Sequence, residues 1–240
     1  DRRPAVDPLR PSRGSPTYAV RAPLVAWLAE EAARAGRDLG RVRVLDVGSG
    51  VKPYLPLFEP YASEYVAVDS IDPHADLLGT VESLPVPDAS FEVVLCTQVL
   101  EHCADPAQAV RELRRVTAPR GRVLASTHGV QVYHPAPDDL WRWTHAGLER
   151  LFAGNADWSS LSVRPGSGTT ACLGMLATHY IDLLAARIGL RRPARALVAG
   201  INAAAEAIDR RSAGLREPVP GTLFANYHVV AEVSVGGGNL

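Results

Sequence analysis

The hydrophobic positions along the chain fall into short continuous runs that alternate with longer stretches of helical periodicity. Four runs are apolar at most positions, and each is bounded by polar or turn-forming residues. They are Val42–Val47, Tyr65–Asp69, Phe91–Thr97 and Gly121–Thr127. Continuous apolar runs of this length are typical of strands buried on both faces of a parallel sheet. Strands that alternate with helices at this spacing predict a parallel, doubly wound α/β sheet.

The stretches around these runs carry apolar residues at three- and four-residue steps, which predicts helices. The predicted helices cover residues 17–35, 105–117, 144–152, 169–188 and 194–211. Asp105 and Pro106 suit a helix start, because Asp caps free N–H groups and Pro fits the first helical position. One further strand is predicted near 161–163, and the alternating segment 224–235 predicts the last one.

This order of elements predicts one α/β domain that carries a helical insertion. The last strand lies far along the chain from its predecessor, so the two long helices between them form an insertion at about residues 168–213. Residues 1–16 are rich in proline and arginine, which predicts a flexible N-terminal arm. The remaining residues, 17–240, are predicted to form a single domain.

The charge balance and the cysteines narrow the class of protein. The formal net charge is −1 and the isoelectric point is about 6.7, so no strong positive field attracts nucleic acid. The three cysteines form no CxxC pair, which predicts free thiols and a cytoplasmic location. The most apolar stretch, 169–190, is interrupted by His179, Asp182 and Arg187, which makes it a poor membrane span.

A glycine-rich turn follows the first predicted strand. Gly48 and Gly50 flank Ser49, which suits a ligand that approaches the backbone closely. The turn is not a nucleoside triphosphate loop, because Lys52 follows Gly50 by two residues and no GxxxxGK[ST] motif exists. Pro53 occupies the third small position of a dinucleotide fingerprint, which weakens the case for NAD without excluding it.

Two acidic residues at strand ends favour S-adenosylmethionine. This molecule needs a tight turn against its methionine part, an acidic group near its ammonium, and a carboxylate for its ribose hydroxyls. Asp46 ends the first predicted strand, and Asp69 ends the second one 23 residues later. A carboxylate accepts both ribose hydroxyls in charge-assisted hydrogen bonds. NAD-binding enzymes share the second acid, so an NAD-dependent oxidoreductase stays an alternative.

Several sequence blocks, in the same order, resemble the class I S-adenosylmethionine-dependent methyltransferases, and most closely their small-molecule type 11 group. The resemblance runs from about Leu45 to Phe152 and includes the last strand. The blocks are VLDVGSG, YVAVDS, ESLPVPDASFEVVLCTQVLEHCADPAQAVRELRRVTAPRGRVLASTHG and YHPAPDDLWRWTHAGLERLF. The resemblance implies a Rossmann-like, seven-stranded, mostly parallel sheet with an antiparallel last strand. It also implies S-adenosyl-L-methionine as cofactor and S-adenosyl-L-homocysteine as product.

The resemblance further implies which residues surround the cofactor. The methionine end would lie against the glycine turn, the ribose at the end of the second strand, and the adenine beside the loop that follows. The implied cofactor-binding residues are Tyr18, Arg21, Asp46, Gly48, Ser49, Gly50, Asp69, Ser70, Glu82, Ser83, Leu84, Thr97, Gln98 and Val99. The family often has aspartate where Thr80 stands, so adenine recognition is expected to rely on Glu82 or on backbone groups.

Histidines near two strand ends are candidate general bases, because a hydroxyl acceptor benefits from losing its proton during transfer. His102 follows the Phe91–Thr97 strand, where the alternative is that Glu101 and His102 only orient the loop. His134 lies in the polar loop after the Gly121–Thr127 strand, at the predicted acceptor wall.

Asp139 and Arg142 in the same loop are further catalytic candidates. The alternative is that they form a structural ion pair that holds the loop, with Thr144 as the cap of the next helix. The histidines and cysteines lack zinc spacing, so no metal is predicted.

The sequence excludes some classes of methyl acceptor but does not identify the acceptor itself. The motif [DN]PP[YF] of enzymes that methylate amino groups of nucleic-acid bases is absent after the Phe91–Thr97 strand, which argues against nucleic acid. We expect methyl transfer to a small molecule, a sugar or a lipid-linked glycan, on oxygen. A non-catalytic cofactor-binding regulatory module is the alternative. Four roles are possible for the inserted helices: core packing, a lid over the site, a homodimer interface, or peripheral contact with a membrane.

Overall fold

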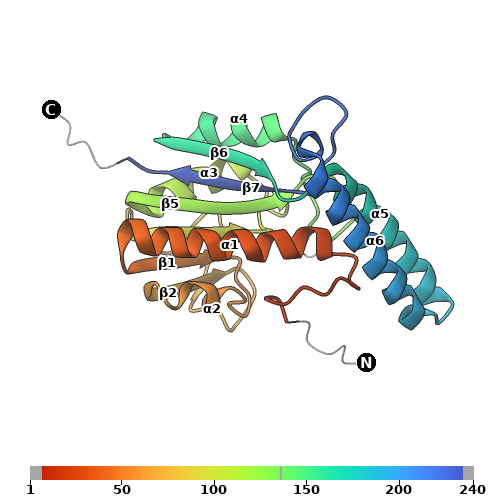
Figure 1. Cartoon of the computed structure of the whole chain (residues 1–240). Helices are drawn as coiled ribbons and strands as arrows, with labels where there is room; N and C mark the ends of the chain where they lie inside the picture. Colours follow the sequence, from red (N-terminus) through yellow and green to blue (C-terminus); the bar gives the residue numbers. More distant parts are fainter. Residues whose placement is uncertain (1–6, 136, 235–240) are drawn as a thin grey trace.

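A seven-stranded mixed sheet lies at the centre of the molecule (Figure 1). The computed structural model describes residues 7–135 and 137–234. The strands are β1 (Val42–Val47), β2 (Ala62–Asp69), β3 (Leu77–Leu78), β4 (Phe91–Thr97), β5 (Thr117–His128), β6 (Ser160–Pro165) and β7 (Asn226–Glu232). Their order across the sheet is β3-β2-β1-β4-β5-β7-β6, and β7 runs antiparallel to both neighbours. The predicted doubly wound α/β fold with an antiparallel last strand is confirmed.

The strand order reverses beside β1, and this reversal determines where a ligand can enter. Strand β1 pairs in parallel with β2 on one side and with β4 on the other. After β1 the chain continues to β2 on one side of it, and it later returns to β4 on the other side. At such a reversal a crevice opens beyond the carboxyl ends of the two strands, here β1 and β4. The glycine turn and the residues after β4 therefore meet at one edge of the sheet.

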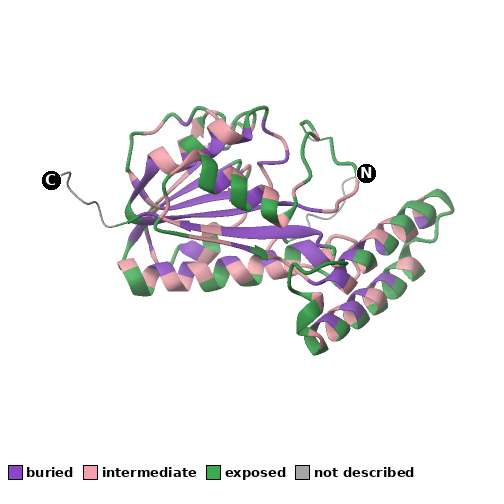
Figure 2. Ribbon diagram, turned by 90° about the horizontal axis from the view of Figure 1, so that it is seen from above, coloured by how far each residue is buried: buried purple, intermediate pink, exposed green. Residues whose placement is uncertain are grey.

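Helices cover both faces of the sheet, and each face has its own hydrophobic core (Figure 2). The covering helices are α1 (Tyr18–Leu39), α2 (Leu55–Phe58), α3 (Pro106–Val116) and α4 (His145–Asn155). Val44 packs in the cluster that contains Leu28 of α1, whereas its neighbour Leu45 packs in the cluster that contains Leu113 of α3. Because successive side chains of a strand point to opposite faces, β1 must be apolar at most of its positions.

The predicted helix starts are confirmed by their caps. The backbone N–H of Gln108 donates to Oδ1 of Asp105 at 3.0 Å at the start of α3. At the start of α4, the N–H of Gly147 donates to Oγ1 of Thr144 at 3.1 Å. Each cap satisfies an N–H group that has no partner within its helix.

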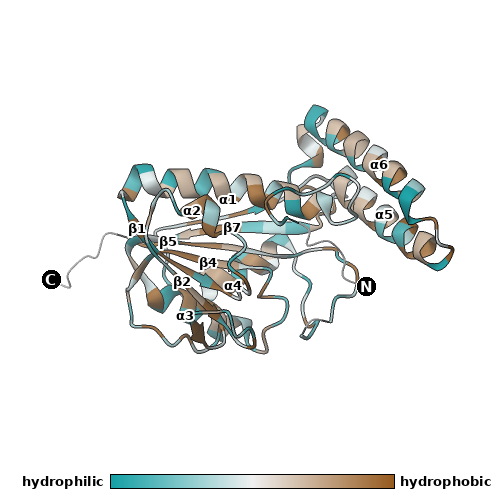
Figure 3. Ribbon diagram, turned by 90° about the horizontal axis from the view of Figure 1, so that it is seen from below, coloured by the Kyte–Doolittle hydropathy of each residue, from teal (hydrophilic) through white to brown (hydrophobic). Residues whose placement is uncertain are grey.

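Two antiparallel helices, α5 (Thr169–Arg187) and α6 (Arg191–Arg211), project from the body as a hairpin before β7 (Figures 1 and 3). This confirms the predicted helical insertion. Asp209 near the end of α6 accepts hydrogen bonds from the N–H groups of Thr170 (3.0 Å) and Ala171 (2.9 Å), which fastens the base of the hairpin. No helix in the described part of the chain is long and apolar enough to cross a membrane. A short 3₁₀ helix, Ala213–Leu215, follows α6.

The described part of the predicted arm, residues 7–16, contacts the hairpin. The side-chain amide of Asn202 on α6 donates to the carbonyl oxygens of Arg13 (2.8 Å) and Ser15 (3.0 Å). Arg13 also forms an ion pair with Glu206 at 3.0 Å. The division into an arm (1–16) and a single domain (17–240) stays a prediction, and residues 1–6 lie outside the described residues.

Candidate functional site

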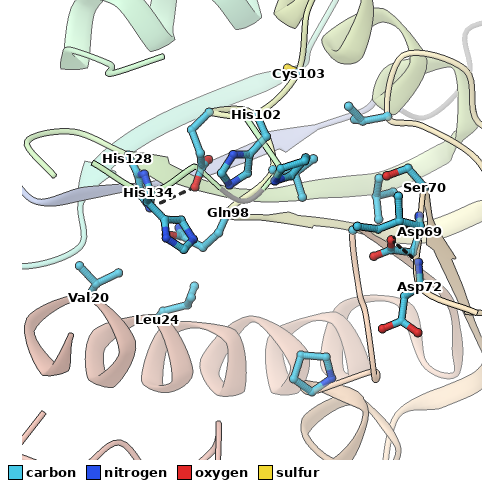
Figure 4. A pocket seen from close by; sticks show the side chains of 18 of the residues that line it. Val20, Leu24, Asp69, Ser70, Asp72, Gln98, His102, Cys103, His128 and His134 are labelled. Atoms are coloured by element: carbon cyan, nitrogen blue, oxygen red, sulfur yellow. Dashed lines mark hydrogen bonds and ion pairs between the residues drawn. The ribbon is translucent and has the colours of Figure 1, made fainter. Parts of the chain in front are cut away.

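A cavity of about 760 Å³ lies beyond the carboxyl ends of β1, β2, β4 and β5. Its volume is typical of sites for small molecules and cofactors. Figure 4 shows three histidines and Gln98 at one end of this cavity and Asp69, Ser70 and Asp72 at the other. Val20 and Leu24 of α1 line the cavity near the histidine end.

The glycine turn is required by close packing at the edge of the sheet. Gly48 has φ +70° and Gly50 has φ +52°, in the region that favours glycine. A Cβ atom at Gly48 would lie 2.4 Å from Cγ2 of Val99, so only glycine fits against the chain after β4. The Gly48 N–H donates to the carbonyl of Val68 at 2.8 Å, which holds the turn over β2.

Asp69 presents an ionised carboxylate to the cavity. Oδ2 accepts the N–H of Gly50 at 3.0 Å, and Oδ1 accepts the N–H groups of Ile71 and Asp72, each at 3.0 Å. Burial acts to raise the pKa of Asp69, but these backbone donors together hold its pKa below the usual value. The carboxylate therefore keeps its charge at neutral pH and joins the glycine turn to the loop after β2.

Asp46 is buried beneath the turn, and like Ser49 and Gly50 it is not among the residues that line the cavity. Its Oδ2 accepts the hydroxyl of Tyr65 at 2.5 Å, whereas its Oδ1 and the nearby Ser49 hydroxyl have no hydrogen-bond partner among the described residues. Burial raises the pKa of Asp46 to about 7, although the hydrogen bond from Tyr65 opposes the shift. An unpartnered buried carboxylate oxygen costs free energy unless a ligand completes its contacts.

Asp46 predicts how stability depends on pH in the cofactor-free protein. Since burial raises its pKa from 3.8 to about 7, the folded state holds a proton that the unfolded state has lost. The Asp46 contribution to the unfolding free energy should therefore be fully present below pH 4 and decrease by up to about 4 kcal/mol as pH rises to 7. Asp46→Asn should gain stability relative to the parent over this range, as measured by urea unfolding at several pH values.

Tyr65→Phe supplies the matched control for this titration. It removes the donor that lowers the pKa of Asp46. The decrease in stability should then extend to higher pH than in the parent. A stability difference between Asp46→Asn and the parent that does not change with pH would contradict this account of Asp46.

The residues predicted to border the adenine divide into two groups. Glu82 lines the cavity, and its Oε1 accepts the N–H of Ala104 at 2.9 Å, which connects the loops after β3 and β4. Ser83 and Leu84 are not among the lining residues. Leu84 is buried, and its N–H donates to Glu112 of α3 at 2.9 Å. Their predicted contacts with adenine are therefore not favoured by this arrangement.

The residues predicted near the methionine end also differ in position. Gln98 and Val99 line the cavity, whereas Thr97 is buried at the end of β4. The Gln98 amide donates to Ser126 Oγ and to Asn226 Oδ1, each at 2.9 Å, so neighbouring strands hold it.

The two residues predicted on α1 point in different directions. Arg21 lines the cavity, but Tyr18 does not. The Tyr18 hydroxyl lies 3.5 Å from Glu206 on α6, and the Arg13 guanidinium lies 5.7 Å from the Tyr18 ring centroid. Tyr18 therefore joins α1 to the hairpin.

Three histidines meet at the end of the cavity opposite Asp69. The ring centroid of His102 lies 6.4 Å from that of His128 and 5.8 Å from that of His134, and the last two are 6.3 Å apart. Their segments are tied together, because the N–H groups of Leu140 and Trp141 donate to the Glu101 carbonyl at 3.0 and 3.1 Å. The predicted candidates His102 and His134 are therefore neighbours in space.

His102 and His128 have different electrostatic surroundings. His102 Nδ1 contacts the carbonyl oxygen of Asp138; since a carbonyl only accepts, Nδ1 carries the hydrogen and Nε2 is the acceptor nitrogen. His128 Nε2 lies 3.1 Å from Oε1 of the fully buried Glu101, whose Oε2 accepts the Thr127 hydroxyl at 2.8 Å. Burial, with nearby positive charge, lowers the pKa of His128 to about 3, and burial raises the pKa of Glu101. His128 is therefore uncharged at neutral pH, and burial disfavours the charged form of Glu101.

Asp139 and Arg142 form the ion pair that the sequence left as an alternative. Arg142 donates to both Asp139 oxygens, at 2.5 and 2.8 Å, and to the Val132 carbonyl at 2.9 Å. Asp139 also accepts the backbone N–H of His134 at 2.9 Å. The Arg142 bonds hold the pKa of Asp139 well below its usual range. Neither residue lines the cavity, so this arrangement gives them a structural role in holding the loop that carries His134.

Several lining residues were missed from the sequence. Glu101 and His128 were not identified as a pair, because they lie 27 positions apart. Glu101 follows β4 and His128 ends β5, and only the pairing of these two strands brings them together. His179 lines the cavity from α5, and no local motif marks it. Asp72 could have been found, because it follows Asp69 in the same loop. The described residues contain no group of three His, Cys, Asp or Glu side chains arranged to hold a metal ion.

Comparisons with known proteins agree with this geometry. Residues 45–125 match the family model "Methyltransferase domain". An uncharacterized methyltransferase, YcgJ of Bacillus subtilis, is 33% identical over 130 residues, which is 43% of this chain and 49% of that protein. A malonyl-[acyl-carrier protein] O-methyltransferase of Serratia marcescens is 29% identical over 127 residues, 48% of this chain and 50% of that one. The chain thus spans about half the length of these curated relatives.

Solved structures share the fold at lower sequence identity. The [4+2]-cyclase SpnF is similar with a TM-score of 0.54 and 20% identity, over 88% of this chain and 82% of that one. A putative sarcosine dimethylglycine methyltransferase of Galdieria sulphuraria gives a TM-score of 0.55 at 14% identity, over 89% and 86% of the two chains. One of these two structures is named a cyclase and the other a methyltransferase, so the shared fold alone does not determine the reaction.

Proposed function

Residues 45–125 belong to the class I, S-adenosylmethionine-dependent methyltransferase domains, and from this premise we propose that the protein transfers a methyl group to a small-molecule acceptor. One observation carries the proposal. The ionised Asp69 and the partly unpartnered Asp46 lie at adjacent strand ends, on either side of a glycine turn that borders the cavity. This arrangement offers separate acidic groups to a ribose and to an amino-acid ammonium.

The residues of the chain fit S-adenosylmethionine. Asp69 would accept the ribose hydroxyls, since its oxygens have lone pairs beyond those used by the backbone. Asp46 and Ser49 would complete their contacts with the methionine end, where Asp46 Oδ1 and Ser49 Oγ have no partner among the described residues. A positive ammonium beside Asp46 would lower its raised pKa again. When bound, the cofactor supplies a methyl group already activated by a sulfonium.

The histidine end of the cavity suits a hydroxyl acceptor. His102 is the group that we assign as proton acceptor, because its hydrogen lies on Nδ1 and leaves Nε2 available. His134 lines the same end and would orient the acceptor, and the buried Glu101–His128 pair lies beside both histidines. Oxygen is therefore the acceptor atom that we favour. The Serratia relative named as an O-methyltransferase agrees with this choice.

The acceptor class that we propose is a small molecule, a sugar or a lipid-linked glycan. The cavity volume of about 760 Å³ accommodates a cofactor together with a compact acceptor group. Orienting both partners in one crevice accelerates an in-line displacement by making it effectively intramolecular. The net charge of −1 disfavours a nucleic acid.

Two measurements test the proposal in sequence. Calorimetry with S-adenosylhomocysteine should give saturable binding, whereas NAD should give none. Incubation with methyl-labelled cofactor and a metabolite mixture, followed by mass spectrometry, should then give a labelled product. Binding of NAD without S-adenosylhomocysteine would overturn the cofactor assignment. Binding of S-adenosylhomocysteine with no labelled product from any acceptor class would instead favour the non-catalytic module.

A further inference from the structure

The α5–α6 hairpin carries an apolar surface that no other described element covers. Leu173, Tyr180 and Leu184 on α5, and Ile188 at its C-cap, recur at helical spacing and are exposed. The opposite side of α5 is also apolar, because Cys172 and its neighbours pack against α1. A helix that is apolar on all sides is normally buried, so this face lacks the partner that its composition requires.

The exposed apolar residues continue to the far end of the hairpin. We define the hairpin tip as residues 183–197, which join α5 to α6. Ile188 is 68% exposed, Leu190 is 52% exposed and Leu197 is 55% exposed. Figure 3 shows apolar positions along both helices and at the turn between them, well away from the body of the sheet. The hairpin tip therefore presents large apolar side chains on the part of the molecule that projects furthest.

The hairpin tip is also strongly basic. It contains four arginines, and no Asp or Glu occurs anywhere from 183 to 205. The arginines are Arg187, Arg191, Arg192 and Arg195. All four are exposed, and none forms an ion pair with another residue of the described ranges 7–135 and 137–234. Apolar and arginine side chains at one projecting end form the combination that binds the interface of an anionic bilayer.

A second copy of the hairpin offers little to match this charge. Its acidic residues are Asp182, Glu206 and Asp209. Glu206 already pairs with Arg13 and Arg210, and Asp209 accepts the N–H groups at the start of α5. Pairing two hairpins would bring the arginines of both copies close together. Among the three acidic residues of each hairpin, Asp182 is the one that these contacts leave free to balance that charge. Charge complementarity therefore favours a negative surface of another kind.

We propose that the hairpin tip docks the protein on an anionic membrane surface. The arginines would contact lipid phosphates, and Ile188, Leu190 and Leu197 would enter the headgroup region. His179 of α5, which lines the cavity, precedes the C-cap residue Ile188 by nine residues, which corresponds to a helical rise of about 14 Å. A docked tip would therefore hold the cavity close to the membrane. The inference does not depend on which acceptor is methylated.

Vesicle co-sedimentation of the whole chain tests the proposal. Vesicles of phosphatidylcholine with phosphatidylglycerol should bind the protein, and vesicles of phosphatidylcholine alone should not. The double variant Arg191→Gln/Arg192→Gln should weaken binding to the anionic vesicles by about 30-fold. Arg211→Gln/Arg216→Gln, which removes the same charge at and just after the C-terminal end of α6, is the matched control and should bind like the parent. Ile188→Ser/Leu190→Ser should also reduce binding.

Calorimetry with S-adenosylhomocysteine checks that each variant is folded, independently of the vesicles. Equal binding of the parent to neutral and anionic vesicles would overturn the proposal, as would equal loss in the two arginine variants. A stable dimer in light scattering that Ile188→Ser/Leu190→Ser converts to monomer, without vesicle binding by the parent, would assign this surface to a second copy instead.

Discussion

Asp69→Ala is expected to weaken S-adenosylhomocysteine binding by about 100-fold, because hydrogen bonds from two ribose hydroxyls to a charged acceptor are lost. The carboxylate is held in the ionised state by backbone N–H groups, which lower its pKa. The variant also removes the acceptor that Gly50, Ile71 and Asp72 share. Both effects act on the same end of the cavity. Isothermal titration calorimetry measures the dissociation constant directly.

Two further variants separate the charge from the loop geometry. Asp69→Asn keeps one oxygen acceptor and the shape of the side chain, so it should fall between the parent and the alanine variant. Asp88→Ala removes an exposed carboxylate that pairs with Arg115 at 2.7 Å, away from the cavity, and should bind like the parent. If Asp69→Ala binds S-adenosylhomocysteine as tightly as Asp88→Ala, the ribose does not lie at Asp69.

His102→Ala is expected to lower the rate of methyl transfer by at least about 100-fold, because it removes the proposed proton acceptor. S-adenosylhomocysteine affinity should be unchanged, since His102 lies at the other end of the cavity from Asp69 (Figure 4). The rate is measured as labelled product formed under saturating cofactor and acceptor. Added imidazole should restore part of the activity, because it can accept the proton in place of the missing ring.

His145→Ala is the matched control for this prediction. The His145 ring contacts the Val163 carbonyl at 2.9 Å and is not among the lining residues of the cavity, so transfer should be retained. His134→Ala should raise the KM for the acceptor more than it lowers kcat, because His134 is assigned to orient the acceptor. Full activity of His102→Ala would show that another residue accepts the proton. The same conclusion would follow if imidazole restored activity to His134→Ala but not to His102→Ala.

The elements that were predicted well share one physical property. Strands β1 and β4 are buried on both faces, so most of their positions must be apolar. This produces short runs of mostly apolar residues that can be recognised in the sequence. The elements that were missed are short. Strand β3 has two residues and α2 has four, so neither is long enough to show a period. They exist because the neighbouring β2 edge and α1 offer them a place to pack.

The cofactor end of the site could be predicted because its requirements are local. The turn needs glycine where φ is positive, and the acids follow directly from the ends of β1 and β2. The acceptor end could not be predicted to the same degree. The sequence did not distinguish a catalytic role for Asp139 and Arg142 from a role in holding the loop. Their hydrogen bonds to Val132 and His134 in the structure favour the second role. The same holds for Tyr18, whose contact is on α6.

The amino-acid sequence by itself determined the order of the longer strands and helices, the glycine turn and the two acids at strand ends, because each depends on residues that are close together in the chain. Only the tertiary structure decided that Glu101 faces His128, that His102 and His134 are neighbours, and that His179 reaches the cavity from the inserted hairpin. Such contacts join residues far apart in the chain. Their distances depend on the pairing of β4 with β5 and on how the hairpin packs against α1, which no local pattern encodes.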